Sequence, residues 1–139
     1  MWRADLVPGL HRFFQGISPE KSLSGWERVS WGDSFADVVR NYPQAGEKNG
    51  QLILTPADPV QRPWTLTFDF DASRQLSSVT LSFAGSQETA DFATLSQEIT
   101  NRLGAPVQST DATNVWRRDD SEITLSTRPD GGVVLSETV

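Results

Sequence analysis

Few side chains in this sequence of 139 residues combine the types and spacing that catalysis requires. Ser18 and Lys21 fit the pattern S-x-x-K, in which a lysine one helical turn away activates a serine nucleophile. The companion motifs S-D-N and K-T-G are absent, and Pro19 favours a loop at this point. We therefore interpret Ser18 as a surface residue.

Paired carboxylates offer a second kind of chemistry. Asp69 and Asp71 flank Phe70, and side-chain alternation along a strand places both on one face, where they could bind a hard cation or act as an acid–base pair. An EF-hand loop is excluded, because Arg74 stands where that loop needs glycine and Thr80 where it needs glutamate. We favour a solvated sheet edge beside a turn.

A similar acidic cluster near the C-terminus lies beside two arginines. Asp119, Asp120 and Glu122 follow Arg117 and Arg118 directly. Opposite charges around a turn pair only weakly in water. We expect this cluster to be structural, and keep a hydrolase or metal-dependent enzyme built on these aspartates as the third hypothesis.

The remaining chemistry is limited by what the chain lacks. Without cysteine there is no disulfide, thiol nucleophile or cysteine metal site, and the single histidine, His11, is expected on the surface. No G-x-G-x-x-G, P-loop or G-x-S-x-G motif occurs. We therefore expect no enzyme, no cofactor and no metal site.

The charge indicates which partners suit the chain. Twelve Lys and Arg against eighteen Asp and Glu give a net charge of −6, which argues against nucleic acid or an anionic membrane and suits a basic protein partner or plain solubility. No run is long enough to cross a bilayer, and the first residues lack a secretory signal. We expect a cytoplasmic protein as written, or a periplasmic one if a signal sequence has been removed; the oligomeric state stays open.

The chain divides into two segments, 1–25 and 26–139, which must position the candidate residues. Residues 1–25 are predicted to form an N-terminal amphipathic arm, whose helix begins near Pro8. Its apolar stripe is expected to bind a partner or to pack on the chain's own sheet. The stripe consists of Trp2, Leu6, Leu10, Phe13 and Phe14.

Residues 26–139 are predicted to form one domain of two similar units, about 33–84 and 89–139. In the first, Ser34 and Asp37 form a capping box for a helix with Phe35, Val38, Val39 and Tyr42 on one face. Alternating apolar residues predict strands at 51–55, 64–70 and 76–83.

The second unit repeats this order at a spacing of about 57 residues. A helix is predicted over 89–103, ending at Gly104, with strands at 107–116, 122–127 and 132–136. The predicted fold class is α+β: one antiparallel sheet with two amphipathic helices on one face, in tandem helix-β-β-β units, plus the N-terminal helical arm.

Tryptophan and arginine, which are enriched at interface hot spots, lie together at Trp116, Arg117 and Arg118. We name these three, with the stripe of the arm, as candidate partner-binding residues. The alternative is that the tryptophans close the ends of the core.

A helix ending in Leu103-Gly104-x-Pro106, followed by Trp116 and by strands reading Ile-Thr-Leu (123–125) and Val-Val-Leu (133–135), resembles bacterial β-lactamase-inhibitor-like and small outer-membrane lipoprotein domains. The order of elements is also similar to that of acidic secretion chaperones. These resemblances imply protein binding, and they carry over no functional residue.

The leading hypothesis is a non-catalytic protein-binding module of a bacterial accessory, inhibitor or adaptor type. The alternatives are an acidic secretion-chaperone-like protein and a carrier of a small apolar ligand. The pocket of such a carrier would be lined by Trp64, Phe68, Phe70, Phe83 and Phe92.

Overall fold

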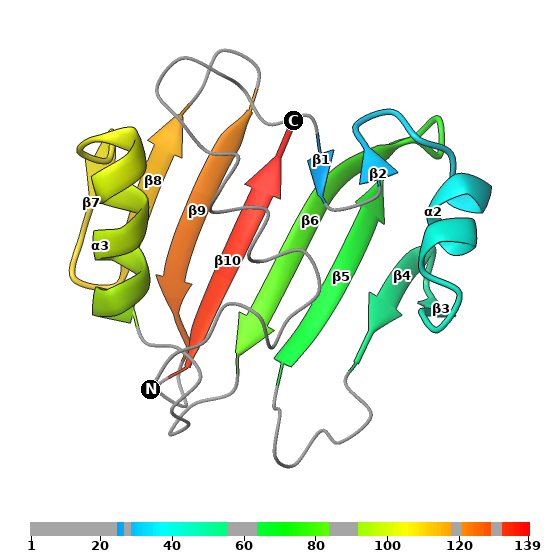
Figure 1. Cartoon of the computed structure of the whole chain (residues 1–139), viewed down its shortest axis with the longest axis horizontal. Coiled ribbons are helices and arrows are strands. Elements are labelled where there is room, and N and C mark those ends of the chain that lie inside the picture. The colour runs from blue at the N-terminus through cyan, green and yellow to red at the C-terminus, as the bar shows by residue number, and fades with distance from the viewer. Residues whose placement is uncertain (1–24, 27–28, 56–63, 84–91, 118–120, 129–131) are drawn as a thin grey trace.

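The computed structural model describes residues 25–26, 29–55, 64–83, 92–117, 121–128 and 132–139, and their main element is one antiparallel sheet (Figure 1). Its strand order is β3-β4-β5-β6-β10-β9-β8-β7. The bounds are β3 Gly46–Lys48, β4 Gln51–Leu54, β5 Trp64–Phe70, β6 Leu76–Phe83, β7 Gln108–Ser109, β8 Thr113–Arg117, β9 Glu122–Thr127 and β10 Val133–Thr138.

Three smaller groups of elements complete the described fold. Strands β1 (Gly25–Trp26) and β2 (Val29–Ser30) form a hairpin of their own. The helices are α2 (Phe35–Asn41) and α3 (Phe92–Leu103). No helix among the described residues is long and apolar enough to span a membrane.

The strands follow the alternation of the sequence. On β5, Trp64, Leu66 and Phe68 are buried, whereas Thr65 and Thr67 between them are half-buried. Cross-strand partners extend this pattern, because buried leucines stand side by side in adjacent strands. One such row runs Leu66, Leu81, Leu135 and Leu125, over β5, β6, β10 and β9. The predictions of strands at 64–70 and 122–127 are confirmed.

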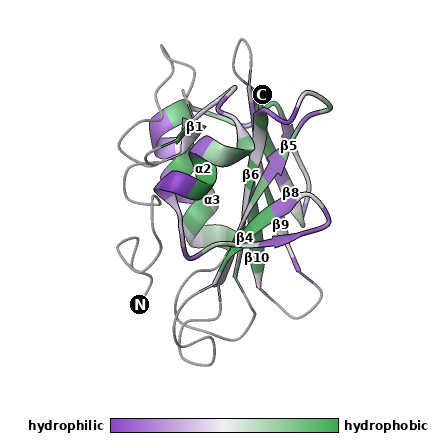
Figure 2. Ribbon diagram, turned by 90° about the vertical axis from the view of Figure 1, so that its right-hand side faces the viewer, coloured by the Kyte–Doolittle hydropathy of each residue, from purple (hydrophilic) through white to green (hydrophobic). Residues whose placement is uncertain are grey.

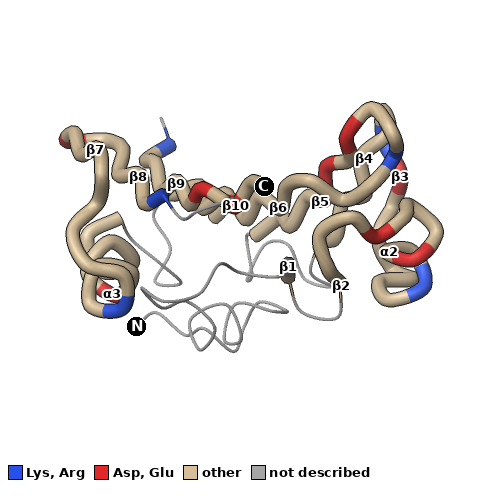
Figure 3. Tube along the Cα trace, turned by 90° about the horizontal axis from the view of Figure 1, so that it is seen from above, with Lys and Arg blue, Asp and Glu red and all other residues tan. Residues whose placement is uncertain are grey.

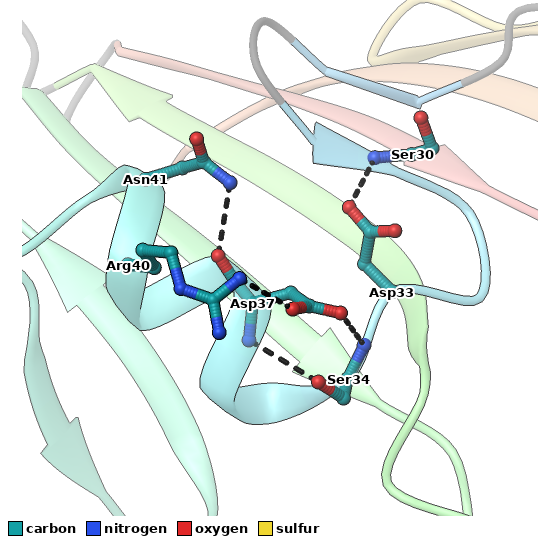
Figure 4. A network of polar contacts seen from close by, with 6 residues as sticks. All are labelled: Ser30, Asp33, Ser34, Asp37, Arg40 and Asn41. Atoms are coloured by element: carbon teal, nitrogen blue, oxygen red, sulfur yellow. Dashed lines mark hydrogen bonds and ion pairs between the residues drawn. The ribbon is translucent and has the colours of Figure 1, made fainter.

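Local signals also place α2. Ser34 Oγ accepts a hydrogen bond from the Asp37 N–H at 3.2 Å, and the Asp37 carboxylate accepts one from the Ser34 N–H at 3.4 Å, so the predicted capping box is confirmed (Figure 4). Hydrogen bonds from Ser34 and the nearby charge of Arg40 lower the pKa of the Asp37 carboxyl. Asp33 accepts a bond from the Ser30 N–H at 2.8 Å, which joins β2 to this cap.

The predicted α+β class is wrong, because strands dominate the described residues and the two helices are short, with 7 residues in α2 and 12 in α3. Helix α2 has room to bury fully only Val38, and Val39, predicted on its buried face, is 37% exposed. Figures 1 and 3 show the helices at opposite ends of the sheet, so they do not form a helical layer. The core is therefore built chiefly from strand side chains.

The two halves of the sheet have the same order of elements, a helix followed by four strands: α2 to β6, and α3 to β10. They meet where β10 pairs with β6 on one side and β9 on the other, and we call this pairing the central junction. Phe35 and Phe92, which are 57 residues apart, begin the two helices, but this spacing does not hold throughout, because β4 lies 57 residues before β7 and not before β8. An origin by duplication stays a prediction.

Candidate functional site

The broadest surface that the described elements leave uncovered is one face of the sheet. Figure 2 views the sheet nearly edge-on, with both helices on the same side, and Figure 3 shows the β1–β2 hairpin on that side too. The opposite side carries the alternate residues of β5, β6, β10, β9 and β8. We call it the hydroxyl face. Its residues are Thr65, Thr67, Asp69, Ser78, Thr80, Ser82, Thr113, Val115, Arg117, Glu122, Thr124, Ser126, Val134, Ser136 and Thr138.

Serine and threonine make up most of this face, and the register aligns them in rows. One row runs Thr67, Thr80, Ser136, Thr124 and Val115 across five strands. Hydroxyls bond laterally within rows: Ser78 Oγ lies 3.1 Å from Thr138 Oγ1. Because each hydroxyl can both donate and accept, the rows keep hydrogen-bonding capacity for a ligand or partner.

The hydroxyl face is shallowly concave. Figure 3 looks along the sheet and shows its outer parts, at β7 and at β4, bending away from the helices. Such a shape fits a convex surface better than a flat one.

A polar recess of about 460 Å³ lies at the β4–β5 end of the sheet. It brings Asp69 and Asp71 together, as the sequence predicted. Asp69 accepts a hydrogen bond from the Gln51 side chain. Asp71 Oδ1 accepts bonds from the backbone N–H groups of Ser73 and Gln75, at 2.9 and 3.1 Å. The remaining lining residues are Asn49, Gly50, Phe70 and Arg74.

These bonds assign the two aspartates structural tasks. Asp71 shapes the turn between β5 and β6, and Asp69 joins β5 to β4. Within the described part of the chain, no group of three or more His, Cys, Asp or Glu is placed to hold a metal ion. The recess lies where the hydroxyl face, through Asp69, meets the side of α2, since Phe70 and the Arg74 guanidinium in its lining both contact the Phe35 ring.

The candidate partner-binding residues have different environments. Trp116 is in the core at 2% exposure, and its indole N–H donates to the Gly104 carbonyl at 3.2 Å, so it offers a partner almost no surface. Arg117 lies at a corner of the hydroxyl face and pairs with Glu122 at 3.0 Å. Arg118 lies outside the described residues, as do the arm residues Trp2, Leu6, Leu10, Phe13 and Phe14.

The aromatic residues proposed to line an apolar-ligand pocket pack in the core. Trp64, Phe68 and Phe83 are buried, and Phe70 and Phe92 pack against the same cluster. The ring of Phe68 lies 4.9 Å from that of Tyr42, centroid to centroid. Of the five, only Phe70 reaches the recess.

Two features were not identified as sites from the sequence. The alternation of Thr and Ser with apolar residues in 65–67, 80–82 and 124–126 could have indicated a polar face of the sheet. The strand Val133, Leu135, Glu137 places a carboxylate in the buried register, and that pattern alone could have singled out Glu137.

No protein-family model matches the chain, and no curated protein matches it either. Among solved structures, its fold is similar to that of a DUF4309 family protein (YjgB) from Bacillus subtilis subsp. subtilis str. 168, with a TM-score of 0.59 and 13% sequence identity. The similarity covers 98% of this chain and 97% of that one. At this identity it shows the fold alone. The predicted likeness to a bacterial domain is thus supported coarsely, and no resemblance to β-lactamase inhibitors is shown.

Proposed function

We propose that this chain is a non-catalytic protein-binding module, of accessory, inhibitor or adaptor type, whose hydroxyl face binds a convex, polar surface of a partner protein. The observation that carries the proposal is the predominance of short hydroxyl side chains on a concave face, in rows that run over β5, β6, β10 and β9 and end on β8 at Thr113 and the buried Val115.

The residue types support this proposal. Exposed strands commonly carry long charged side chains, which lose much conformational entropy when a partner immobilises them. Threonine and serine have few rotamers to lose and present both donors and acceptors. A face built from them can form many hydrogen bonds with a partner at a small ordering cost.

The charges on this face predict how the interaction responds to salt. Arg117 and Glu122 pair at 3.0 Å, and the other charges at the rows include Asp69 and the Arg128 guanidinium, which donates to Ser82 Oγ at 2.8 Å. Although the whole chain has a net charge of −6 and would attract a basic partner over a distance, contacts at this face are chiefly uncharged. We therefore expect the association rate to fall with salt while the dissociation rate changes little.

The test replaces small hydroxyls by long charged side chains. We expect Thr80→Lys and Thr124→Lys, both near the centre of the face, to abolish binding by obstructing the concave surface. Thr94→Lys is the matched control, because Thr94 is exposed on α3, on the opposite side of the sheet. Proteins captured from source lysate would be identified by quantitative mass spectrometry, and one purified candidate measured by calorimetry.

A partner retained by the unmodified chain and by Thr94→Lys, but lost from both face variants while their circular dichroism is unchanged, supports the proposal. Equal binding to all four proteins would refute it. Deleting residues 1–20 in the same assay tests the alternative that the arm with Trp2 and Leu6 forms the contact.

A further inference from the structure

Glu137 is a carboxylic acid in a position that the sheet otherwise gives to apolar residues. It lies on β10 in the buried register of Val133 and Leu135, and its side chain is 1% exposed. Its cross-strand partners are Val79 on β6 and Ile123 on β9, both fully buried. Neither carboxylate oxygen has a hydrogen-bond partner among the residues that the structure describes.

A second polar group without a partner lies at the same end of the sheet. Ser121, directly before β9, is 5% exposed, and its hydroxyl makes no hydrogen bond to any described part of the chain. Alternation places it on the face of Ile123, diagonally across from Glu137. Figures 1 and 3 show β1, which carries the buried Trp26, over this end of β6 and β10.

No charged side chain among the described residues faces Glu137. Its own strand presents Leu135 there, β6 presents Val79, and β9 presents Ile123 and Ser121. The nearest acid along β9, Glu122, points to the hydroxyl face and pairs with Arg117. An ionised carboxylate would therefore be unpaired in an apolar site, so burial favours the neutral, protonated form of Glu137.

We propose that Glu137 is a proton-sensitive switch on the central junction: when neutral, it lets β10 stay packed between β6 and β9, and when ionised, it draws the end of β10 out of the core towards water.

The topology explains why the ionisation of one side chain affects the pairing between the two halves of the sheet. In the described sheet, β10 alone joins the two halves. Glu137 and Thr138 form the last pairs with both neighbouring strands. Moving Glu137 into water breaks these pairs on both sides and opens one end of the junction, while the leucine row through Leu135 stays closed.

The proton linkage has a definite sign. Burial raises the pKa of Glu137 from 4.5 to about 8. Between these values the folded chain holds a proton that the unfolded chain has released, so stability falls as pH rises. Over this range, the unfolding equilibrium constant is expected to rise tenfold for each pH unit, which corresponds to about 1.4 kcal/mol of lost stability. The effect ends above the pKa of the folded state.

Denaturant unfolding from pH 5 to pH 9 tests the proposal on the full chain. The unmodified chain should lose stability over this range, and Glu137→Gln, which cannot ionise, should lack this component of the slope. Glu47→Gln is the matched control, because Glu47 is an exposed glutamate on β3 of the same sheet; its profile should follow that of the unmodified chain. Parallel profiles for Glu137→Gln and the unmodified chain would overturn the proposal.

Two measurements on the unmodified chain do not depend on how the variant folds. The Glu137 side-chain carbonyl carbon should titrate by NMR well above the other glutamates, and amide exchange at residues 136–139 should accelerate, beyond its ordinary pH dependence, more than exchange at Leu125. An ordinary titration, or uniform exchange along β10 and β9, would contradict the switch.

Discussion

Asn114 connects three elements through one buried amide. It stands on the core face of β8, donates to Ser96 Oγ on α3 at 2.9 Å, and accepts a hydrogen bond from Ser109 Oγ on β7. A buried amide with both ends bonded fixes the position of its neighbours more narrowly than an apolar contact does. The orientation of α3 on the sheet depends on it.

We expect Asn114→Ala to destabilise the fold by about 1–3 kcal/mol, because it removes both bonds of a buried amide and leaves the half-buried Ser96 hydroxyl without this donor. Urea unfolding measures the change. Asn101→Ala removes an exposed amide bonded within α3 and should cost less than about 0.5 kcal/mol. Equal losses of unfolding free energy in the two variants would show that the bonds of Asn114 contribute no more than the exposed bond of Asn101.

Ser34 supports α2 in a different way, by satisfying a free backbone N–H at its first turn. Ser34→Ala should cost about 1 kcal/mol. Because hydrogen bonds from Ser34 are the main cause of the lowered pKa of Asp37, NMR titration of this variant should show that pKa closer to its ordinary value. A pKa of Asp37 that does not move would contradict the role of the capping box.

The same lowered pKa makes the stability of the unmodified chain depend on pH. The stabilisation from Asp37 is present above the pKa of its unfolded state, 3.8, and is lost as the pH falls through the lower pKa of its folded state.

The capping box could be predicted and the Asn114 bonds could not, for a physical reason. Ser34 and Asp37 are three residues apart, so the chain brings them together wherever a helix begins. Asn114 and Ser96 can form their hydrogen bond only after β8 and α3 have packed together. For Glu137, the strand pattern could indicate the buried register, whereas its apolar neighbours on β6 and β9 could not be predicted.

At the scale of elements, the sheet ends in two very short strands. Strand β3 has three exposed residues and β7 has two. A short edge with charged residues resists pairing with another chain. Glu47 and Lys48 supply those charges on β3.

Replacing both Glu47 and Lys48 by valine should therefore promote self-association, since it leaves an apolar edge with high β-propensity. Sedimentation velocity over a range of concentrations measures this. The same two substitutions placed on α3, at the exposed Thr94 and Gln97, serve as the control. If the edge variant sediments as the unmodified chain does, the charges are not needed for protection.

Long alternating strands were predictable, and the edge strand β7 lies within the predicted strand 107–116, but the other edge strand, β3, was not predicted. Strand β5 alternates over seven residues, a pattern that few other structures produce. Strand β3 has the sequence GEK, which carries no periodicity and becomes a strand only because β4 offers it a partner. The α+β class was wrong for a related reason. The apolar positions that indicated helices do lie in helices, but these helices are short, with 7 and 12 residues, beside a sheet of eight strands.

At the scale of the whole molecule, the buried residues of both halves belong to one cluster, which includes Leu66 from one half and Leu125 from the other. A chain with a single core unfolds cooperatively. The repeated order of elements, by contrast, would allow two halves of independent stability.

We expect one transition, with tryptophan fluorescence and far-ultraviolet circular dichroism giving the same denaturation midpoint. Trp64 reports on the first half and Trp116 on the second, so the single-tryptophan variants that retain one or the other distinguish the halves. Different midpoints for these variants, after correction for their own stabilities, would show that the halves unfold separately.

The central place of β10 has a consequence for biosynthesis. Residues 133–138 leave the ribosome after every other described strand, yet they fill the middle of the sheet. Until then, β6 and β9 each have an unsatisfied edge, and nascent chains with such edges aggregate with one another. Among the described strands, the one that closes the sheet is therefore made last, and a polypeptide cut short before β10 would be a natural substrate for cellular quality control.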